Sequence, residues 1–366
     1  MLIFLIIIVI LGIIALPYWL IPTHPFPQPS GQWQVGKSDL IWDAPSQSGI
    51  IAKVWYPTDR DLVTDSPYLG KIGKTFSKNL VVNLLFKLIF SHLLLGHIRI
   101  PASIDAALSQ SQSNFSVVLF SSGLRINFLN SFYALEFASH GFIVVGIDHP
   151  GLSVSTMLVN GAQIGMDKEI SDGLARPDLL VSKIAVTQAN QISIVLDRVM
   201  DMNFTNNSFL HQKINTNRIF AAGHSIGGSA SFVACGKDLR ISKSVNLDGY
   251  FYIDEIDLSR TEKDFLLILS NREKYTLDDG KSQSTHQAMM AKDKVRIQQL
   301  AGNANLKMLK LESASHFSFL DLPLMINPKL KKTIGLVGEA DPLVILSKTS
   351  AIGIDFFNRP TVTIID

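Results

Sequence analysis

The sequence predicts an α/β fold in which one mostly parallel sheet carries helices on both faces. Short apolar runs of strand length alternate with helical patterns from about residue 40 to the end of the chain, which is typical of a single α/β sheet. The 366 residues contain no linker-like low-complexity stretch and no internal repeat. We therefore expect one domain over residues 32–366, preceded by a separate apolar segment at residues 1–22.

The expected strands are apolar runs bounded by turn-forming residues. In chain order they cover residues 117–120, 142–147, 219–222, 241–247, 265–269 and 306–311. The expected helices cover residues 79–95, 179–202 and 282–299, and another begins in the small residues after Gly227. This order supplies the alternation of strand and helix on which the fold prediction depends.

The motif Gly223-His224-Ser225-Ile226-Gly227 follows the apolar run 219–222 directly. It matches the G-x-S-x-G pattern of a nucleophile elbow, a sharp strand-to-helix turn that lifts one serine hydroxyl above the edge of a sheet. The small residues after it allow the next helix to pack closely on the sheet. The motif predicts that Ser225 is a catalytic nucleophile and that the fold is of the α/β-hydrolase type.

A serine hydroxyl needs a base within hydrogen-bond reach, because it is a poor nucleophile at neutral pH. In this fold the chain order is serine, then acid, then histidine. Two of the nine histidines, His286 and His316, lie far enough downstream of Ser225. His286 falls in a polar helical stretch, whereas His316 follows the strand 306–311 and a short loop. We therefore expect His316 to be the general base.

The residues alone leave two choices for the acid that orients this base. Asp248 ends the strand 241–247 and precedes Gly249, a position that also suits an ordinary turn aspartate. Glu273 lies just past the strand 265–269, where many serine hydrolases carry their acid. Position favours Asp248 and keeps Glu273 open.

An oxyanion hole combines the N–H of the residue after the nucleophile with an N–H from an earlier strand-to-helix loop. Ile226 supplies the first donor. The strand 117–120 runs into Ser121-Ser122-Gly123-Leu124, so we expect the second donor to be Leu124. The alternative is a plain glycine loop.

Together these segments resemble the platelet-activating-factor acetylhydrolase family, which includes the plasma and intracellular type II lipases. The similar segments are residues 54–57, 100–102, 120–124, 138–144, 223–228, 246–249 and 315–319. The resemblance implies that Asp248 is the acid, that Leu124 and Ile226 are the oxyanion donors, and that no calcium is required. It also implies phospholipid substrates with short or oxidised sn-2 chains. One departure is Ser122, where the family usually has histidine, which puts the rigidity of that loop and the substrate range in question.

Composition excludes several other functions. The net charge is +2 with no basic run, so nucleic acid is not an expected partner. Cys235 is the single cysteine, which rules out an internal disulfide and a thiolate metal cluster. Walker A, H-E-x-x-H and dinucleotide-binding patterns are missing. We expect neither a cofactor nor a metal.

The N-terminal segment from Met1 to Pro22 has no charged side chain and is almost entirely apolar to Leu16. About 20 apolar residues suffice to cross a bilayer core. A cleaved signal peptide normally has a basic start, a shorter apolar core and a small-residue cleavage site. The pattern therefore favours an uncleaved membrane anchor, with the catalytic domain outside the cytoplasm. The alternative is secretion after cleavage.

A second apolar stretch runs from Asn79 to Leu95, with a polar residue every fourth position. This spacing predicts a helix with one narrow polar stripe. Two interpretations stand: a helix in the membrane interface that passes lipid to the site, or a buried helix under the sheet.

These observations lead to the hypothesis of a serine-dependent carboxylic ester hydrolase acting on lipid-like esters. A general carboxylesterase or polyester hydrolase of the same fold is the first alternative. The second is an inactive, membrane-tethered binding scaffold.

Overall fold

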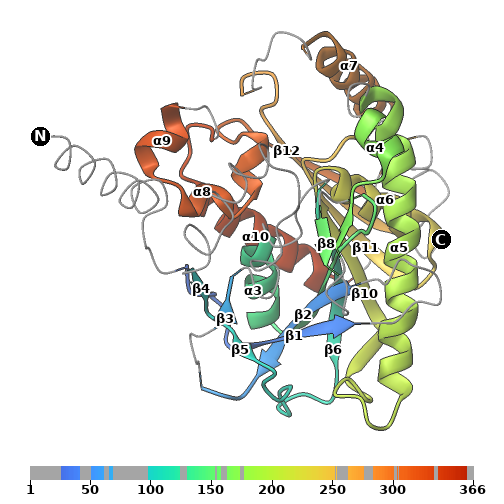
Figure 1. Cartoon of the computed structure of the whole chain (residues 1–366), viewed down its shortest axis with the longest axis vertical. Coiled ribbons are helices and arrows are strands. Elements are labelled where there is room, and N and C mark those ends of the chain that lie inside the picture. The colour runs from blue at the N-terminus through green and yellow to red at the C-terminus, as the bar shows by residue number, and fades with distance from the viewer. Residues whose placement is uncertain are drawn as a thin grey trace, which may run out of the picture.

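A mostly parallel sheet forms the centre of the computed structural model (Figure 1). Its nine strands lie in the order β13-β12-β11-β10-β6-β7-β2-β1-β5. The structure describes residues 26–41, 51–61, 66–68, 98–123, 130–152, 155–157, 163–173, 177–251, 253, 263–275, 283–300, 303, 305–333 and 337–360.

The strands of this sheet have the following bounds: β1 Gln34–Ile41, β2 Ile51–Thr58, β5 Ser103–Ile104, β6 Phe115–Ser121, β7 Phe142–Ile147, β10 Ile214–His224, β11 Ile241–Leu247, β12 Asp264–Ser270 and β13 Leu306–Leu311. Two small strand pairs are β3 Ser66–Pro67 with β4 Arg99–Ile100, and β8 Ser155–Met157 with β9 Gln163–Gly165. The helices are α3 Ser131–Ser139, α4 Lys168–Gly173, α5 Pro177–Phe204, α6 Ile226–Lys237, α7 Gln283–Leu300, α8 Leu322–Met325, α9 Pro328–Thr333, α10 Pro342–Asn358 and the 3-10 helix η3 His316–Phe319.

The predicted fold class is confirmed in its central sheet and helices. All six strands expected from the sequence are present. β10 is longer than its apolar run, because the polar residues 215–218 continue the strand before Ile219. The antiparallel β1–β2 pair at the start of the sheet was not among the expected elements.

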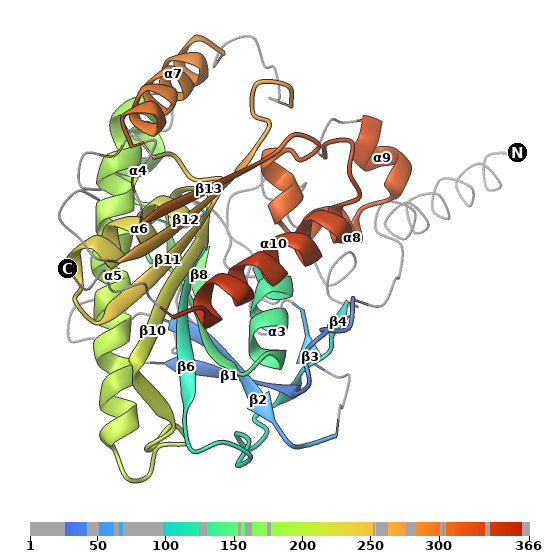
Figure 2. The same cartoon turned by 180° about the vertical axis from the view of Figure 1, so that it is seen from behind.

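Two apolar cores lie on opposite faces of the sheet. Side chains alternate along a strand, so Val117 and Leu119 of β6 enter one core and Val118 and Phe120 enter the other. Helices α5 and α6 cover the first face, and α3 and α10 cover the second (Figure 1; seen from behind in Figure 2). Both faces are therefore shielded, as a parallel sheet requires.

The parallel strands bring their carboxyl ends to one edge. β6 pairs in parallel with β10, and β10, β11, β12 and β13 follow as parallel neighbours. The loops after these strands therefore lie side by side at that edge, which is where ligands bind in open α/β sheets.

Several predictions concern residues outside those that the structure describes. They are the anchor at residues 1–22, the amphipathic stretch at residues 79–95 and the proposed oxyanion donor Leu124. Within the described part of the chain, no helix has the length and apolar character needed to span a membrane.

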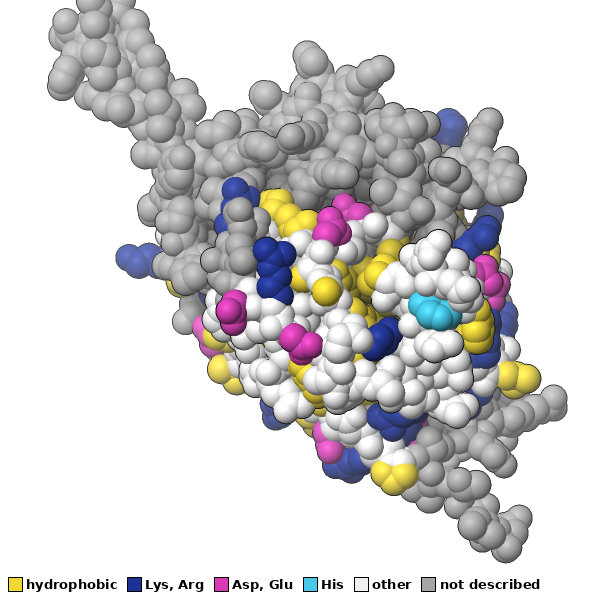
Figure 3. All heavy atoms as spheres, turned by 90° about the horizontal axis from the view of Figure 1, so that it is seen from below, with side chains coloured by type: hydrophobic (Ala, Val, Ile, Leu, Met, Phe, Trp, Pro, Cys, Tyr) yellow, Lys and Arg dark blue, Asp and Glu magenta, His cyan; other side chains and the backbone are white. Residues whose placement is uncertain are grey.

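On the face shown in Figure 3, the coloured basic and acidic side chains are interspersed rather than gathered by sign.

Candidate active site

Ser225 lies at the turn between β10 and α6, at the carboxyl edge of the sheet. Its backbone has φ 58° and ψ −132°, a conformation that is costly for a residue with a side chain. The Ser225 N–H donates to the carbonyl oxygen of Leu247 at 2.9 Å. A Cβ on Gly227 would lie 2.2 Å from the carbonyl oxygen of Ser121, so the close approach of the start of α6 to the end of β6 requires glycine there.

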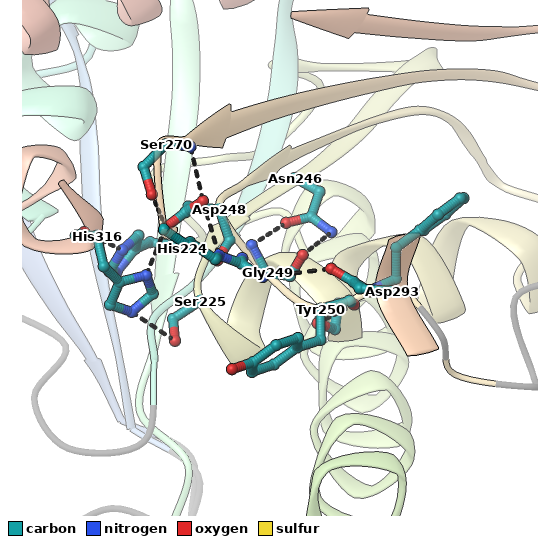
Figure 4. A network of polar contacts seen from close by, with 12 residues as sticks. His224, Ser225, Asn246, Asp248, Gly249, Tyr250, Ser270, Asp293 and His316 are labelled. Carbon is teal, nitrogen blue, oxygen red and sulfur yellow. Dashed lines mark hydrogen bonds and ion pairs between the residues drawn. The ribbon is translucent and has the colours of Figure 1, made fainter. Parts of the chain in front are cut away.

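His316 is the residue that faces this serine. Its Nε2 lies 3.1 Å from Ser225 Oγ (Figure 4). His316 opens the 3-10 helix η3 after β13, and Ser315 with Ser318 forms a capping box at that start. The cap fixes the backbone from which the imidazole projects.

Asp248 is the carboxylate that hydrogen-bonds to His316. Its Oδ2 accepts the Nδ1–H of His316 at 2.6 Å, and the Asp248 side chain is fully buried. Because the carboxylate can only accept, His316 carries its proton on Nδ1 and presents an unprotonated Nε2 to Ser225. Glu273, the rival acid, lies on the exposed loop after β12, and His286 falls in the first turn of α7.

Asp248 is held by donors on both oxygens. Ser270 donates its N–H to Oδ1 and its hydroxyl to Oδ2, both at 2.8 Å. Burial alone would raise the pKa of Asp248, but the Arg272 guanidinium and the hydrogen bonds from His316 and Ser270 lower it well below its usual range. Asp248 is therefore ionised at neutral pH.

His224, inside the elbow motif, hydrogen-bonds to the backbone of His316. Its Nε2 donates to the backbone carbonyl oxygen of His316 at 3.1 Å, and the two ring centroids are 4.6 Å apart. Burial, helped by the nearby His316, lowers the pKa of His224 to about 3. It stays neutral and ties the His316 backbone to β10.

The loop after β6, which the sequence predicts to supply an oxyanion donor, passes close to Ser225. A Cβ on Gly123 would lie 3.1 Å from Ser225 Cβ. Ile226 is the first residue of α6, so its N–H has no acceptor within the helix and can face a ligand. Leu124 lies outside the described residues.

His149 hydrogen-bonds to Ser121, where the loop after β6 begins. Its Nδ1 donates to Gln191 Oε1 at 2.6 Å, which leaves Nε2 to accept the Ser121 hydroxyl at 2.8 Å. Burial lowers the pKa of His149 to about 4, so it remains neutral. Ser122, which replaces the family histidine, is itself buried in this region.

His149 follows the strand 142–147, which predicts a place at the carboxyl edge of the sheet, either lining the pocket or in a turn with Asp148. Two other supporting residues, Arg272 and Asp293, carry no such signal in the sequence. Arg272 stands beside Glu273, in the loop after β12. Asp293 lies in a polar helix with no motif. Their roles depend on contacts between distant segments, which spacing in a single sequence does not show. Within the described residues, no cluster of three or more potential metal ligands occurs.

The geometry joins a hydroxyl, an imidazole and a carboxylate, which suits nucleophilic attack on a carbonyl. A family model described as platelet-activating factor acetylhydrolase, isoform II, matches residues 20–361. The chain belongs to this family. It is accordingly a carboxylic ester hydrolase.

Curated members of the platelet-activating-factor acetylhydrolase family are distant relatives. The platelet-activating factor acetylhydrolase of Canis lupus familiaris is 24% identical over 357 residues, covering 91% of this chain and 76% of the relative. The enzyme of the same name from Gallus gallus is 22% identical over 352 residues, with 87% and 79% covered.

Among solved structures, a ferulic acid esterase from Streptomyces cinnamoneus is similar, with a TM-score of 0.62. It is 19% identical, and the match covers 94% of this chain and 96% of that chain. At this identity the similarity supports the fold and says nothing of the substrate.

Proposed function

We propose that this protein is a serine lipase that hydrolyses phospholipids with short or oxidised sn-2 acyl chains and needs no calcium. The observation that carries the proposal is the hydrogen-bonded series Ser225–His316–Asp248 at the carboxyl edge of the sheet. The substrate class comes from the family to which the chain belongs and from its named relatives.

In the proposed reaction, Ser225 Oγ attacks the acyl carbonyl carbon while His316 Nε2 takes the hydroxyl proton. Asp248 stabilises the imidazolium, and the N–H groups of Ile226 and Leu124 hold the oxyanion. His316 then gives its proton to the departing alcohol, which leaves an acyl group on Ser225. Water attacks this ester with His316 again as base, the acid departs, and the proton returns to Ser225.

The test is hydrolysis of matched acetyl, butyryl and long-chain esters, presented as soluble nitrophenyl esters and as phospholipids, with and without a calcium chelator. Ser225→Ala is the blank, because loss of the nucleophile is expected to reduce kcat by about 10⁴-fold or more. Turnover of short-chain phospholipids above the soluble esters, unaffected by chelator, supports the proposal. Activity that persists in Ser225→Ala contradicts it.

The second candidate is a general carboxylesterase or polyester hydrolase. Ser122 favours it, because this residue replaces the histidine usual in the family beside the oxyanion glycine. Hydrolysis confined to the soluble esters would favour this candidate and leave the mechanism in place. Absence of both hydrolysis and phosphonate labelling of Ser225 would indicate the inactive scaffold instead.

We also propose that residues 1–22 anchor the chain in a membrane with the catalytic domain outside the cytoplasm. Alkaline carbonate extraction of membranes from expressing cells tests the anchor. The full chain should stay in the membrane pellet, and a chain beginning at Thr23 should be released. Equal release of both would contradict the proposal.

A further inference from the structure

Arg272 donates two hydrogen bonds to Asp248, the proposed acid of the triad Ser225–His316–Asp248. Its Nε donates to Asp248 Oδ1 at 3.1 Å, and its terminal nitrogen donates to the backbone carbonyl oxygen of the same residue. His316 uses the other oxygen, Oδ2. Arg272 therefore fixes both the plane of the carboxylate and its backbone, which has φ 56°. A left-handed aspartate needs such support, because the conformation is costly for a residue with a side chain.

Arg272 is itself held in place from two other directions. Its Nη1 lies 3.3 Å from Asp293 Oδ2, and its guanidinium lies 4.6 Å from the centroid of the Tyr250 ring. The Arg272 side chain is only 10% exposed. A planar guanidinium suits this arrangement, because it can donate in several directions and stack on an aromatic ring at the same time.

Asp293 connects this cluster to helix α7. Its side chain is 6% exposed, and its Oδ1 accepts the backbone N–H of Phe251, three residues after the acid. Figure 4 shows Asp293 on its helix beside the loop that carries Asp248, Gly249 and Tyr250. A surface helix thus joins the loop that carries the acid.

The net charge of this buried cluster is zero when His316 is an imidazolium. A lone cation beside Asp248 would cancel the negative charge that stabilises the His316 imidazolium. Asp293 restores that charge on the far side of Arg272. The two carboxylates and the guanidinium leave one negative charge, which the imidazolium neutralises when it forms.

Two further titratable groups face the cluster and stay neutral around pH 7. Burial lowers the pKa of His224 to about 3, with the nearby His316 acting in the same direction. Burial raises the pKa of Tyr250 to about 12. The charge of the cluster therefore depends on Asp248, Arg272 and Asp293, and on the proton that His316 takes up during the proposed reaction.

We infer that Arg272 and Asp293 are positioning residues for the triad: Arg272 fixes Asp248, and Asp293 restores the negative charge that stabilises the His316 imidazolium. This inference rests on the proposed roles of Ser225, His316 and Asp248. Neither residue touches the substrate.

The test measures two quantities against pH in the full-length protein: kcat/KM for p-nitrophenyl acetate and the rate of Ser225 labelling by a fluorophosphonate. Labelling needs the same activated serine and does not depend on the natural substrate. The variants are Arg272→Gln, Arg272→Lys and Asp293→Asn. Arg240→Gln is the matched control, because Arg240 pairs with Asp197 and Asp238 away from the triad.

Removing the cation should favour the imidazolium, so Arg272→Gln should move the acidic limb of both profiles to higher pH by about half a unit or more. Removing the anion should do the reverse, so Asp293→Asn should move the limb to lower pH. Arg272→Lys keeps the positive charge but loses the planar guanidinium that donates in several directions. It should keep the limb in place while the plateau falls by about 10- to 100-fold.

If the acidic limbs of Arg272→Gln and Asp293→Asn stay in place, or move in the same direction, the inference is overturned, since a purely structural defect does not reverse sign with charge. If Arg272→Gln fails to fold, the other two variants still test the inference. An acidic limb that does not move in Asp293→Asn overturns the inference, and so does an unchanged plateau in Arg272→Lys. A wild-type protein that is neither labelled nor active overturns the proposed function, and this inference with it.

Discussion

At the scale of single residues, two of the four non-glycine residues with positive φ in the described part of the chain lie where chemistry is proposed. Ser225 and Asp248 both have positive φ, at 58° and 56°. Each is held by a backbone hydrogen bond to the neighbouring strand, from Ser225 N–H to Leu247 and from Asp248 N–H to Ile268. Strain of this kind persists only when the surrounding structure fixes it, and here two adjacent strands do so.

The choice between the two acids can be tested by substitution. Asp248→Asn should lower kcat/KM by about 10³- to 10⁴-fold, because an amide cannot hold the imidazole in the required tautomer. Glu273→Gln should leave kcat/KM within about twofold, since Glu273 is exposed and Asp248 holds His316. Esterase kinetics on a soluble substrate measures both. A large loss in Glu273→Gln with normal activity in Asp248→Asn would reverse the assignment.

At the scale of secondary-structure elements, helix α10 closes one face of the sheet with aromatic side chains. Phe357 stacks on Phe220 of β10, with ring centroids 4.7 Å apart and planes 7° from parallel. It also packs against Phe137 of α3 at 5.9 Å. The contacts join the last helix to the strand that leads into the elbow.

Truncation of this contact should cost stability rather than activity. Phe357 is fully buried, so Phe357→Ala should reduce the free energy of unfolding by about 3–5 kcal/mol. Val344→Ala, on the same helix but 58% exposed, should change it by less than about 0.5 kcal/mol. Urea unfolding measures both, and esterase activity below the transition should be retained. Equal stability of the two variants would show that the Phe357 contact does not stabilise the fold.

At the scale of the whole molecule, folding buries two neutral histidines near the carboxyl edge of the sheet. Burial lowers the pKa of His149 to about 4 and that of His224 to about 3. An unfolded histidine takes up its proton near pH 6.5. Below that pH the unfolded chain binds protons that the folded chain does not, so acid favours unfolding.

The stability of the whole chain should therefore fall as pH drops from about 6.5 to about 4, with each buried histidine contributing about 1.4 kcal/mol per pH unit. His149→Gln should reduce this slope by one histidine's contribution. His140→Gln, on the partly exposed histidine after α3, is the control. Urea unfolding at pH 7, 6 and 5 gives the slopes. An unchanged slope in His149→Gln would contradict the proposed burial effect.

Local sequence patterns predict the fold class, six of the nine strands of the sheet and the elbow around Ser225. These features depend on local patterns, because apolar runs, turn residues and a glycine-bounded serine are adjacent in the chain. His316 could be selected from chain order and the strand before it. The choice of Asp248 over Glu273 needed the family resemblance, since both follow strands that end at the same edge.

Only the tertiary structure showed which groups meet at that edge. Arg272 and Asp293 come from a loop and a helix with no catalytic motif, and His149 comes from the loop after β7. Arg272 reaches Asp248 because β12 ends beside β11, and His149 reaches Ser121 because β7 ends beside β6. Asp293 meets Arg272 from helix α7. Contacts between segments distant in the chain depend on this register, and one sequence records the residues but not their pairing.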